Sequence, residues 1–400
     1  MNKSTKPKVR FAVIGLGHFA QTAILPAFAN ASENSTLSAL VTGDMEKAVA
    51  LSQRYDVPAY RYQEYDRLLE SGNIDAVYIA LPNAQHREYT ERAAKAGVHI
   101  LCEKPLAHTA QDAEAMVRAC EAAQVRLMTG YRLHFEEGNL QAIEAIRSGR
   151  IGDVRLFSSI HTMQVQPDNI RVDRSLGGGP LEDIGIYCIN AARCVFGAEP
   201  EDVFAFEASG NDPRFDEVPE SVSATMRFSG GRLASFVCGF GAIKVSEYRV
   251  VGTKGILIMD PAYTWHDDIH QTIIVGEKLT ERVFEHRDQA AAEILYFAHC
   301  IQNGEDPEPS GREGLTDVRI FEAMRISYSS RRAIRIEPLP TDSQPVPSQS
   351  IERRPPVQPK PINADSRRSS NGGWSADRVG EEREDIQHLV VCPITNGDLM

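Results

Sequence analysis

Short apolar runs alternate with helical segments over the first third of the chain. The apolar runs lie at 9–15, 36–43, 76–82, 99–105 and 126–132, and the residues between them place apolar side chains at helical spacing. Strands joined by helices of this length pair in parallel, because each crossover returns the chain to the same end of the sheet. The pattern therefore predicts a doubly wound, Rossmann-type α/β domain over 8–131.

The pattern changes after residue 131. A helical segment at 138–149 is followed by runs in which apolar and polar residues alternate, separated by short glycine-containing turns such as the one at 229–231. This period-two alternation is typical of antiparallel strands with one buried face. We expect an α+β domain over 132–336, with a broad, mostly antiparallel sheet and two closing helices.

The composition shifts again beyond residue 336. Nine of the 22 prolines lie between Pro338 and the C-terminus, with serine, arginine and glutamine between them. Such a segment buries little apolar surface, so it cannot offset the entropy of ordering its backbone. The sequence therefore predicts a disordered tail over 337–400.

Charge and cysteine usage narrow the class of protein. The net charge of −12 disfavours a nucleic acid or an anionic membrane as partner, since both repel an acidic protein. The seven cysteines show no metal-ligand spacing, so we expect reduced thiols and no bound metal. We see no export signal and no membrane-spanning run, and we expect a cytoplasmic protein.

A glycine-rich loop follows the first predicted strand. Gly15, Gly17 and Ala20 form the pattern G-x-G-x-x-A, with His18 and Phe19 between its last two positions. The first glycine permits a tight turn, the second lets the backbone approach a pyrophosphate, and the following helix supplies amide donors. Because the pattern heads a βαβ unit, it predicts a dinucleotide site over a ligand-free turn.

The end of the second strand indicates which dinucleotide binds. NAD sites usually carry an acid there for the ribose hydroxyls, whereas this strand ends in Thr42, with Lys47 in the next helical turn. A hydroxyl and an amine suit a 2′-phosphate, so NADP is favoured over NAD. Two alternatives remain, namely that Thr42 only caps the helix and that Asp44 occupies the position of the acid.

Polar residues follow the third and fourth strands. Ligands of open α/β sheets bind outside the carboxyl ends of the strands, so Asn83, Glu103 and Lys104 are expected near the nicotinamide end of the crevice. Leu81 and His86 lie in the same loop as Asn83. Taken alone, a loop lysine or histidine is usually a solvated surface residue.

The segment GGGPLEDIGIYCINAARCVFG at 177–197 combines a helix signal with two polar residues. Pro180 suits the first turn and Gly197 suits the end of a helix, while Asp183 and Tyr187 are four residues apart on one face. The spacing is compatible with a buried, hydrogen-bonded tyrosine and with a catalytic one. Upstream, Arg171 and Arg174 are candidate sugar or phosphate contacts, or part of a solvated basic loop.

These motifs resemble a known family, the glucose-fructose oxidoreductase / inositol dehydrogenase (Gfo/Idh/MocA) oxidoreductases. The resemblance covers about residues 8 to 336 and rests on AVIGLGHFA, YIALPNAQHREYTERAAKAGVHILCEKPLA, MTGYR, GGGPLEDIGIY and GTKGILIMDP. Tyr187 stands where many members have histidine, and this form looks most like the glucose-fructose and aldose-aldose oxidoreductase branch.

The resemblance implies roles for single residues. Lys104 and Tyr187 would be the catalytic pair, with Asp183 orienting the sugar hydroxyls. A phenol is a poor base at neutral pH, but a neighbouring ammonium favours its ionised form. The cofactor would be NADP, with NAD less favoured, and the residues expected to hold it are Gly15, Gly17, His18, Phe19, Thr42, Lys47, Leu81, Asn83, His86, Glu103, Lys104, Tyr131 and Arg132.

The implied activity is that of an NADP-dependent sugar oxidoreductase. Hydride would pass between C1 of an aldose and nicotinamide, giving a lactone, and a second sugar could be reduced by the reverse steps. The alternative is a non-catalytic NAD(P)-binding regulator that shares the fold. Family members commonly pair through the second sheet, so a homo-oligomer is expected.

Overall fold

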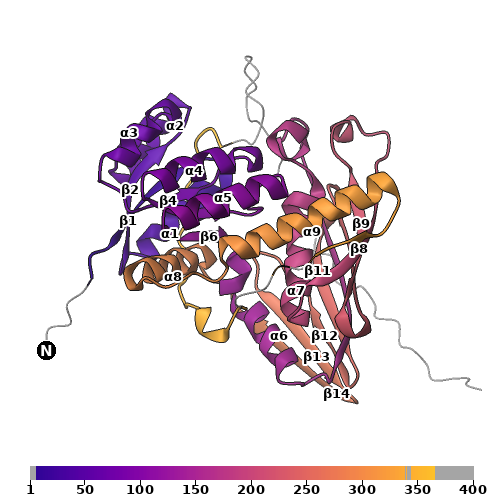
Figure 1. The fold of residues 1–400 in the computed structure, drawn as a ribbon. Coiled ribbons are helices and arrows are strands. Elements are labelled where there is room, and N and C mark those ends of the chain that lie inside the picture. Colours follow the sequence, from indigo (N-terminus) through magenta and orange to yellow (C-terminus); the bar gives the residue numbers. More distant parts are fainter. Residues whose placement is uncertain (1–5, 338, 340–343, 365–400) are drawn as a thin grey trace, which may run out of the picture. The chain divides into compact units, whose positions relative to one another are not determined.

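The computed structural model describes residues 6–337, 339 and 344–364, and its first layer is a six-stranded sheet (Figure 1). The strands follow the order β3-β2-β1-β4-β5-β6, and every pair is parallel. The predicted doubly wound sheet is therefore confirmed. Its strands are β1 Val9–Ile14, β2 Ser35–Val41, β3 Ala59–Tyr60, β4 Ala76–Ile79, β5 His99–Glu103 and β6 Leu127–Gly130.

Helices cover both faces of this sheet. Successive side chains of β1 point to opposite sides and are apolar on both, so each face needs a packing partner. Phe11 packs with α1 (Leu25–Asn30) and α8 (Gln289–Asn303), whereas Ala12 and Ile14 belong to the cluster that contains α3, α4 and α5. The bounds of the remaining helices of this layer are α2 Met45–Tyr55, α3 Tyr65–Glu70, α4 His86–Lys95 and α5 Ala110–Ala122. Helix α8 thus returns from the C-terminal part of the chain to the first sheet.

The second layer is a nine-stranded sheet in the order β14-β13-β12-β11-β7-β10-β9-β8-β15. It is antiparallel except for the pair β7 and β10, so the predicted broad, mostly antiparallel sheet is also confirmed. Its strands are β7 Val154–Gln164, β8 Pro200–Ala208, β9 Ser221–Phe228, β10 Arg232–Gly239, β11 Gly241–Gly252, β12 Gly255–Met259, β13 Ile269–Val275, β14 Lys278–Phe284 and β15 Ile334–Arg335.

Three helices pack against this sheet and connect it to the first layer. Helix α6 (Glu137–Arg147) contacts β13, α7 (Ile186–Phe196) contacts β7, and α9 (Gly311–Ser330) contacts both β8 and α5. Immediately before α7 lies η7 (Leu181–Gly185), a wider helical turn of a kind that is frequent at functional sites. Gly197 ends α7 in a left-handed conformation with φ 58°, as the sequence indicated.

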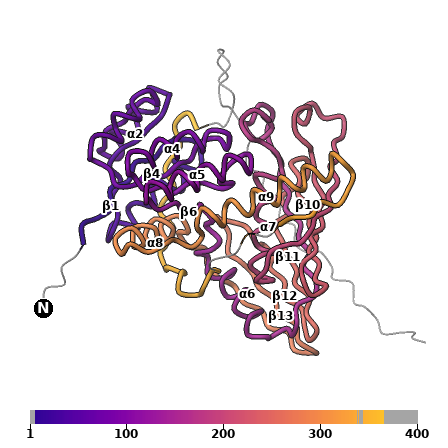
Figure 2. The backbone as a smooth tube through the Cα atoms, in the orientation of Figure 1, coloured from indigo at the N-terminus to yellow at the C-terminus, as the bar shows by residue number. Residues whose placement is uncertain are grey.

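The described part of the C-terminal segment requires a correction to the prediction for 337–400. Residues 344–364 lie against the rest of the chain instead of lacking contacts, and in Figure 2 they are drawn in yellow. The side chains of Ile351 and Ile362 pack on the core that contains Phe11. The rest of the predicted tail, 365–400, lies outside the described residues, as do 338 and 340–343.

The described residues include no helix long and apolar enough to cross a bilayer. Six of the seven cysteines fall in the described part, and all six are buried free thiols.

Candidate active site

The phosphate loop after β1 has the geometry that its glycines predict. Gly15 has φ +90°, and a Cβ there would lie 2.6 Å from the carbonyl oxygen of Ala80 on the neighbouring strand end. A Cβ on Gly17 would meet no atom within 4 Å, so open space lies beside the loop where a pyrophosphate would approach. His18 is exposed and Phe19 is half-buried in the same loop. The residues present therefore fit a dinucleotide.

At the end of β2, the side chains form a helix cap beside a partly buried amine. Asp44 caps α2 by accepting a hydrogen bond from the Lys47 amide at 3.0 Å, and the Thr42 hydroxyl accepts one from the Asp44 amide at 3.3 Å. Burial lowers the pKa of Lys47, more than the neighbouring Asp44 raises it. The cap is therefore supplied by Asp44, and the Lys47 ammonium lacks full solvation.

Lys104, at the end of β5, donates to the opening turn of the second domain. Its Nζ lies 2.6 Å from the carbonyl oxygen of Asp183 and 3.2 Å from Asp183 Oδ1, while Arg171 Nε lies 2.6 Å from Oδ2. Burial alone would raise the pKa of Asp183, but the charges of Arg171 and Lys104 hold it well below its usual value. Burial would likewise lower the pKa of Lys104, but the nearby Tyr187 and Asp183 raise it. The three groups form a partly buried cation–anion–cation array.

Tyr187 lies between two cations at this array. Lys104 Nζ is 4.7 Å and the Arg132 guanidinium carbon is 5.0 Å from the centre of its ring. Arg132 is held in place because it donates to the carbonyl oxygens of Tyr263 and Thr264. The Tyr187 hydroxyl makes no hydrogen bond to any residue that the structure describes, so it is free to bind a ligand.

Three aromatic residues that the sequence analysis did not single out complete the surroundings. His161 meets the Tyr187 ring edge-on at 5.7 Å, and Tyr263 stacks on it at 5.9 Å. Burial lowers the pKa of His161 to about 4, so its ring is neutral at pH 7. Trp265 meets Phe19 edge-on at 5.5 Å. The signal in the sequence for Tyr263 and Trp265 was the aromatic cluster that directly follows GTKGILIMDP, and His161 lies outside it.

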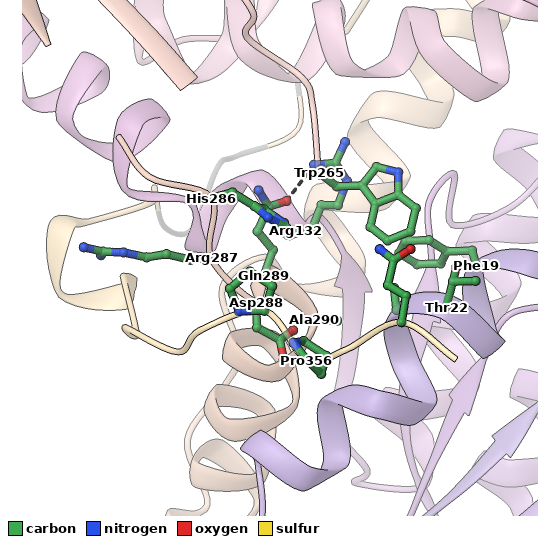
Figure 3. A pocket seen from close by; sticks show the side chains of 13 residues that line it. Phe19, Thr22, Arg132, Trp265, His286, Arg287, Asp288, Gln289, Ala290 and Pro356 are labelled. Carbon is green, nitrogen blue, oxygen red and sulfur yellow. Dashed lines mark hydrogen bonds between the residues drawn. The ribbon is translucent and has the colours of Figure 1, made fainter. Parts of the chain in front are cut away.

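The pocket beside Phe19 joins the phosphate loop to the second domain (Figure 3). Phe19 and Thr22 line one side of it, and Arg132 and Trp265 line the other. In Figure 3 the Trp265 ring faces Phe19, and Arg132 is hydrogen-bonded to Gln289. The phosphate loop and the Tyr187 site therefore share Arg132 as a common wall.

The side chains of two of the predicted cofactor residues, His86 and Tyr131, are directed into the interior, and their part in cofactor binding stays a prediction. The His86 ring is fully buried, and its nitrogens lie within 3.2 Å of the carbonyl oxygens of Leu81, Pro105 and Leu106. Tyr131 is 2% exposed, and its hydroxyl donates to Asp317 Oδ2 at 2.5 Å. Both side chains are used to satisfy buried polar groups, because such groups rarely lack partners.

The side chains of Asn83 and Arg174, two further predicted site residues, form hydrogen bonds to loop carbonyl groups. The Asn83 amide donates to the carbonyl oxygen of Gly177 at 2.8 Å, which joins the third strand end to the glycine loop. Gly177 has φ +82°, and a Cβ there would lie 2.8 Å from Asn83 Cβ. Arg174 is exposed, and its guanidinium donates to the carbonyl oxygen of Glu217, so it is not brought into the Lys104 array.

Glu103, the residue before Lys104, forms a buried acid pair with Glu293 through the Tyr78 hydroxyl. Its Oε1 accepts the Tyr78 hydroxyl at 2.7 Å, and the same hydroxyl is 3.5 Å from Oε2 of the fully buried Glu293. Burial raises the pKa of both carboxyl groups, and the charge of Glu103 raises that of Glu293 further. The pair therefore retains a proton at pH values where exposed carboxyl groups have lost theirs.

The comparison with protein families assigns both domains. Residues 9–131 match a model described as an oxidoreductase family with an NAD-binding Rossmann fold (GFO_IDH_MocA), and residues 139–258 match the GFO/IDH/MocA C-terminal domain.

Several named proteins are similar over most of their length. A D-xylose 1-dehydrogenase [NADP(+)] of Haloarcula marismortui is 34% identical, with 84% of this chain and 95% of that protein covered. The crystal structure of an aldose-aldose oxidoreductase of Caulobacter crescentus in complex with glycerol is 37% identical and superimposes with a TM-score of 0.79, covering 82% of this chain and 100% of that one. A 3-ketoreductase of Actinomadura kijaniata, solved with NADP and TDP-benzene, is 28% identical with a TM-score of 0.74, covering 80% and 98%.

Proposed function

The chain belongs to the Gfo/Idh/MocA family of oxidoreductases, and from this premise we propose that it is an NADP-dependent sugar oxidoreductase. Its reaction is the transfer of hydride between C1 of an aldose, such as xylose or glucose, and nicotinamide, which gives a lactone. The named relatives that oxidise xylose or act on pairs of aldoses support this choice of substrate class.

The observation that carries the proposal is the array of Lys104, Asp183 and Tyr187 at the carboxyl end of β5. Lys104 Nζ lies 4.7 Å from the centre of the Tyr187 ring, and the Tyr187 hydroxyl has no hydrogen-bond partner among the described residues. Lys104 follows β5, at the strand-end edge of the sheet that also bears the phosphate loop. A regulator that only bound a nucleotide would not need a buried lysine held by a carboxylate next to a tyrosine. The geometry therefore favours an enzyme over a non-catalytic regulator.

The residues of the array have distinct roles in the proposed reaction. Tyr187 is the proposed general base that takes the proton from the anomeric hydroxyl, and the positive charges of Lys104 and Arg132 lie 4.7 Å and 5.0 Å from the centre of its ring. Asp183 positions Lys104, and its remaining lone pairs can accept a hydrogen bond from a sugar hydroxyl. His161 is neutral, its Nδ1 lies 3.2 Å from the carbonyl oxygen of Ile184, and its ring contacts the Tyr187 ring.

The first domain is proposed to hold NADP. The amides of the phosphate loop would bind the pyrophosphate, and Lys47 and Thr42 would take the 2′-phosphate. When bound, NADP supplies the hydride acceptor. Arg132 lines the pocket beside Phe19 and also lies 5.0 Å from the centre of the Tyr187 ring, which supports a cofactor position between the loop and Tyr187.

The proposal is tested by an activity screen with the purified full chain. Aldoses and cyclitols are each supplied with NADP⁺ or NAD⁺, and reduced nicotinamide is followed by its absorbance. We expect turnover with at least one aldose and a preference for NADP⁺. Turnover with cyclitols and NAD⁺ alone would contradict the assignment, and so would the absence of turnover with every sugar.

Reduction of a second sugar in the same site is a separate part of the proposal. If the cofactor is recycled in place, an aldose pair will yield lactone and sugar alcohol with no net change in nicotinamide absorbance. Product analysis of a reaction with substoichiometric NADP measures this directly.

The second sheet is proposed to pair with another copy of the chain. Leu156 and Ile160 of β7 and Leu233 and Val237 of β10 are each at least 40% exposed, and the parallel pairing of these strands brings them together on the outer face. We expect a homo-oligomer in a cytoplasmic setting, and a monomeric mass in analytical ultracentrifugation would refute the oligomer.

A further inference from the structure

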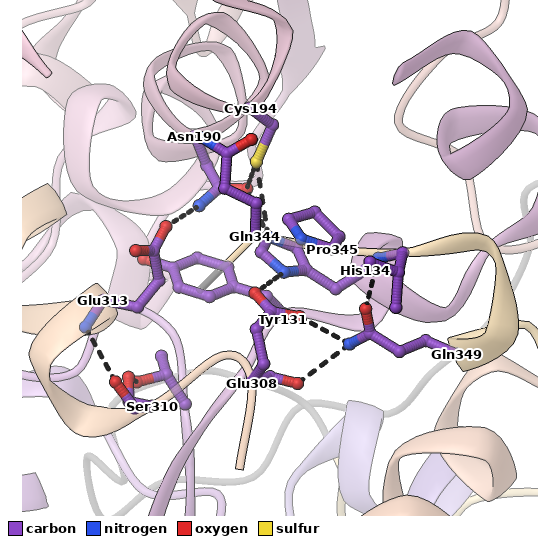
Figure 4. Close-up of polar contacts among 12 residues, drawn as sticks. Tyr131, His134, Asn190, Cys194, Glu308, Ser310, Glu313, Gln344, Pro345 and Gln349 are labelled. Atoms are coloured by element: carbon purple, nitrogen blue, oxygen red, sulfur yellow. Dashed lines mark hydrogen bonds and ion pairs between the residues drawn. The ribbon is translucent and has the colours of Figure 1, made fainter. Parts of the chain in front are cut away.

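The described C-terminal segment extends from the loop after α8 to the phosphate loop. Near its start it forms hydrogen bonds to the loop after α8. Gln349 donates to the carbonyl oxygen of Glu308 at 3.0 Å, and Glu308 accepts from His134 at 2.8 Å (Figure 4). The Arg353 carbonyl then accepts the amide of Asp288 at 3.0 Å, at the start of α8. The segment is therefore attached before it reaches the dinucleotide site.

Its middle part lines the pocket beside the phosphate loop. Pro355, Pro356 and Gln358 share this pocket with Phe19 and Trp265. In Figure 3 the chain that carries Pro356 passes along the side of the pocket next to Ala290 and Thr22. The segment thus forms one wall of the space that adjoins the proposed pyrophosphate position.

Its last part contacts the residues that bracket the proposed adenosine end. Gln21, in the first helical turn after the loop, pairs with Ile362 through two hydrogen bonds of 2.8 Å, from the Ile362 amide to the Gln21 Oε1 and from the Gln21 Nε2 to the Ile362 carbonyl. The Asn363 amide donates to Asp44 Oδ2 at 3.2 Å and to Glu46 Oε2 at 3.1 Å. The segment therefore crosses from the phosphate loop to the end of β2.

The segment needs few contacts to dock on the rest of the chain, because it is rich in proline. Proline fixes φ and limits the conformations of the free chain, so less entropy is lost when the segment docks. The prolines between its attachment points are Pro355, Pro356, Pro359 and Pro361. The same composition that suggested disorder therefore favours docking once specific partners are present.

We propose that the segment 351–364, here called the strap, retains the bound dinucleotide through the residues that line the pocket or pack on the core, and that Asn363 holds the Asp44 and Glu46 carboxylates away from the 2′-phosphate. This inference rests on the proposed NADP site. Release of the cofactor requires the pairing of Gln21 with Ile362 to open. Without the Asn363 amide, two carboxylates face the phosphate unshielded, which weakens NADP binding more than NAD binding.

Three full-length variants that each add one carboxylate to the strap separate these roles. Ile362→Asp places a charge against the apolar core and loosens the strap. Asn363→Asp replaces the amide donor beside Asp44 and Glu46 with a third acid. Val357→Asp is the matched control, because the Val357 side chain is 94% exposed.

The first measurement is the rate at which bound NADPH leaves, followed by its fluorescence after mixing with excess NADP⁺. Ile362→Asp is expected to release NADPH about tenfold faster or more, the factor that corresponds to the loss of one or two hydrogen bonds. Val357→Asp should release it at the wild-type rate. Equal release rates for wild type, Ile362→Asp and Val357→Asp, with unchanged thermal melting, would overturn the proposed role of the strap.

The second measurement is the ratio of the dissociation constants for NADP⁺ and NAD⁺. Asn363→Asp is expected to raise the constant for NADP⁺ about tenfold relative to that for NAD⁺, while Val357→Asp leaves the ratio unchanged. An unchanged ratio in Asn363→Asp would overturn the role of Asn363. Wild-type protein that binds neither NADPH nor NADP⁺ would overturn the proposed function and the strap with it, whereas normal wild-type binding with insensitive variants overturns the strap alone.

Discussion

Replacing Asp183 by asparagine removes the anion from between Lys104, which is 11% exposed, and Arg171, which is 35% exposed. Asp183 Oδ1 lies 3.2 Å from Lys104 Nζ and Oδ2 lies 2.6 Å from Arg171 Nε, and the Lys104 and Asp183 side chains are 11% and 19% exposed. At an effective dielectric constant of about 20, unit charges separated by the Lys104 distance attract by roughly 5 kcal/mol. Breaking a buried pair on one side usually costs about 3–5 kcal/mol, and the partial exposure of this pair favours the lower end.

We therefore expect Asp183→Asn to lower the free energy of unfolding by about 3 kcal/mol at pH 7, measured by urea denaturation. The pKa of Asp183 is below its usual value of 3.8 in the folded chain, so its contribution is present above pH 4 and lost as the pH falls further. The difference between variant and wild type should accordingly shrink in acid.

A matched control is Asp66→Asn, because Asp66 also pairs with an arginine, Arg92 at 2.9 Å, but is 64% exposed at its side chain. This variant should unfold close to the wild-type midpoint. Equal stability of Asp183→Asn and wild type at pH 7 would refute the reasoning, since it would mean that the two cations do not depend on the carboxylate.

Two further predictions concern the phosphate loop and the buried acid pair. Gly17→Ala should keep the wild-type melting temperature, since its Cβ meets no atom within 4 Å, but should lose NADPH binding in a fluorescence titration. Gly15→Ala should lower the melting temperature, because its Cβ would lie 2.6 Å from the Ala80 carbonyl oxygen. Glu293→Gln should gain stability relative to wild type as the pH rises above about 4.5, because burial and Glu103 raise the pKa of Glu293, so the folded chain holds a proton that the unfolded chain has lost. Urea unfolding at several pH values checks the second prediction, and a difference that does not change with pH would contradict it.

The features that sequence could predict are those set by local pattern. Residues 9–20 combine a buried strand, a tight glycine turn and a helix start, so the phosphate loop and its parallel sheet follow from short-range chemistry. The helical turns at Leu181–Gly185 and Ile186–Phe196 were equally well marked by Pro180 and Gly197. Lys104 could be placed near the crevice because ligands bind at the strand ends of such sheets.

The features that sequence could not predict depend on partners far along the chain. The direction of the Tyr131 side chain is set by Asp317, 186 residues away, which needs a donor in the interior. The strap is ordered by Gln21, 341 residues from Ile362, so its composition alone indicated disorder. Helix α8 packs on the first sheet for the same reason, since its apolar residues find their partners on β1 and α1.

The most direct test of the central claim is the turnover of Tyr187→Phe with an aldose and NADP⁺. The substitution removes the hydroxyl that takes the proton but keeps the ring between Lys104 and Arg132. We predict that NADPH binding, measured by fluorescence, is unchanged and that turnover falls by about 100-fold or more, the usual contribution of a general base. Turnover at the wild-type rate, with cofactor bound, would show that Tyr187 is not the proton acceptor and would contradict the account.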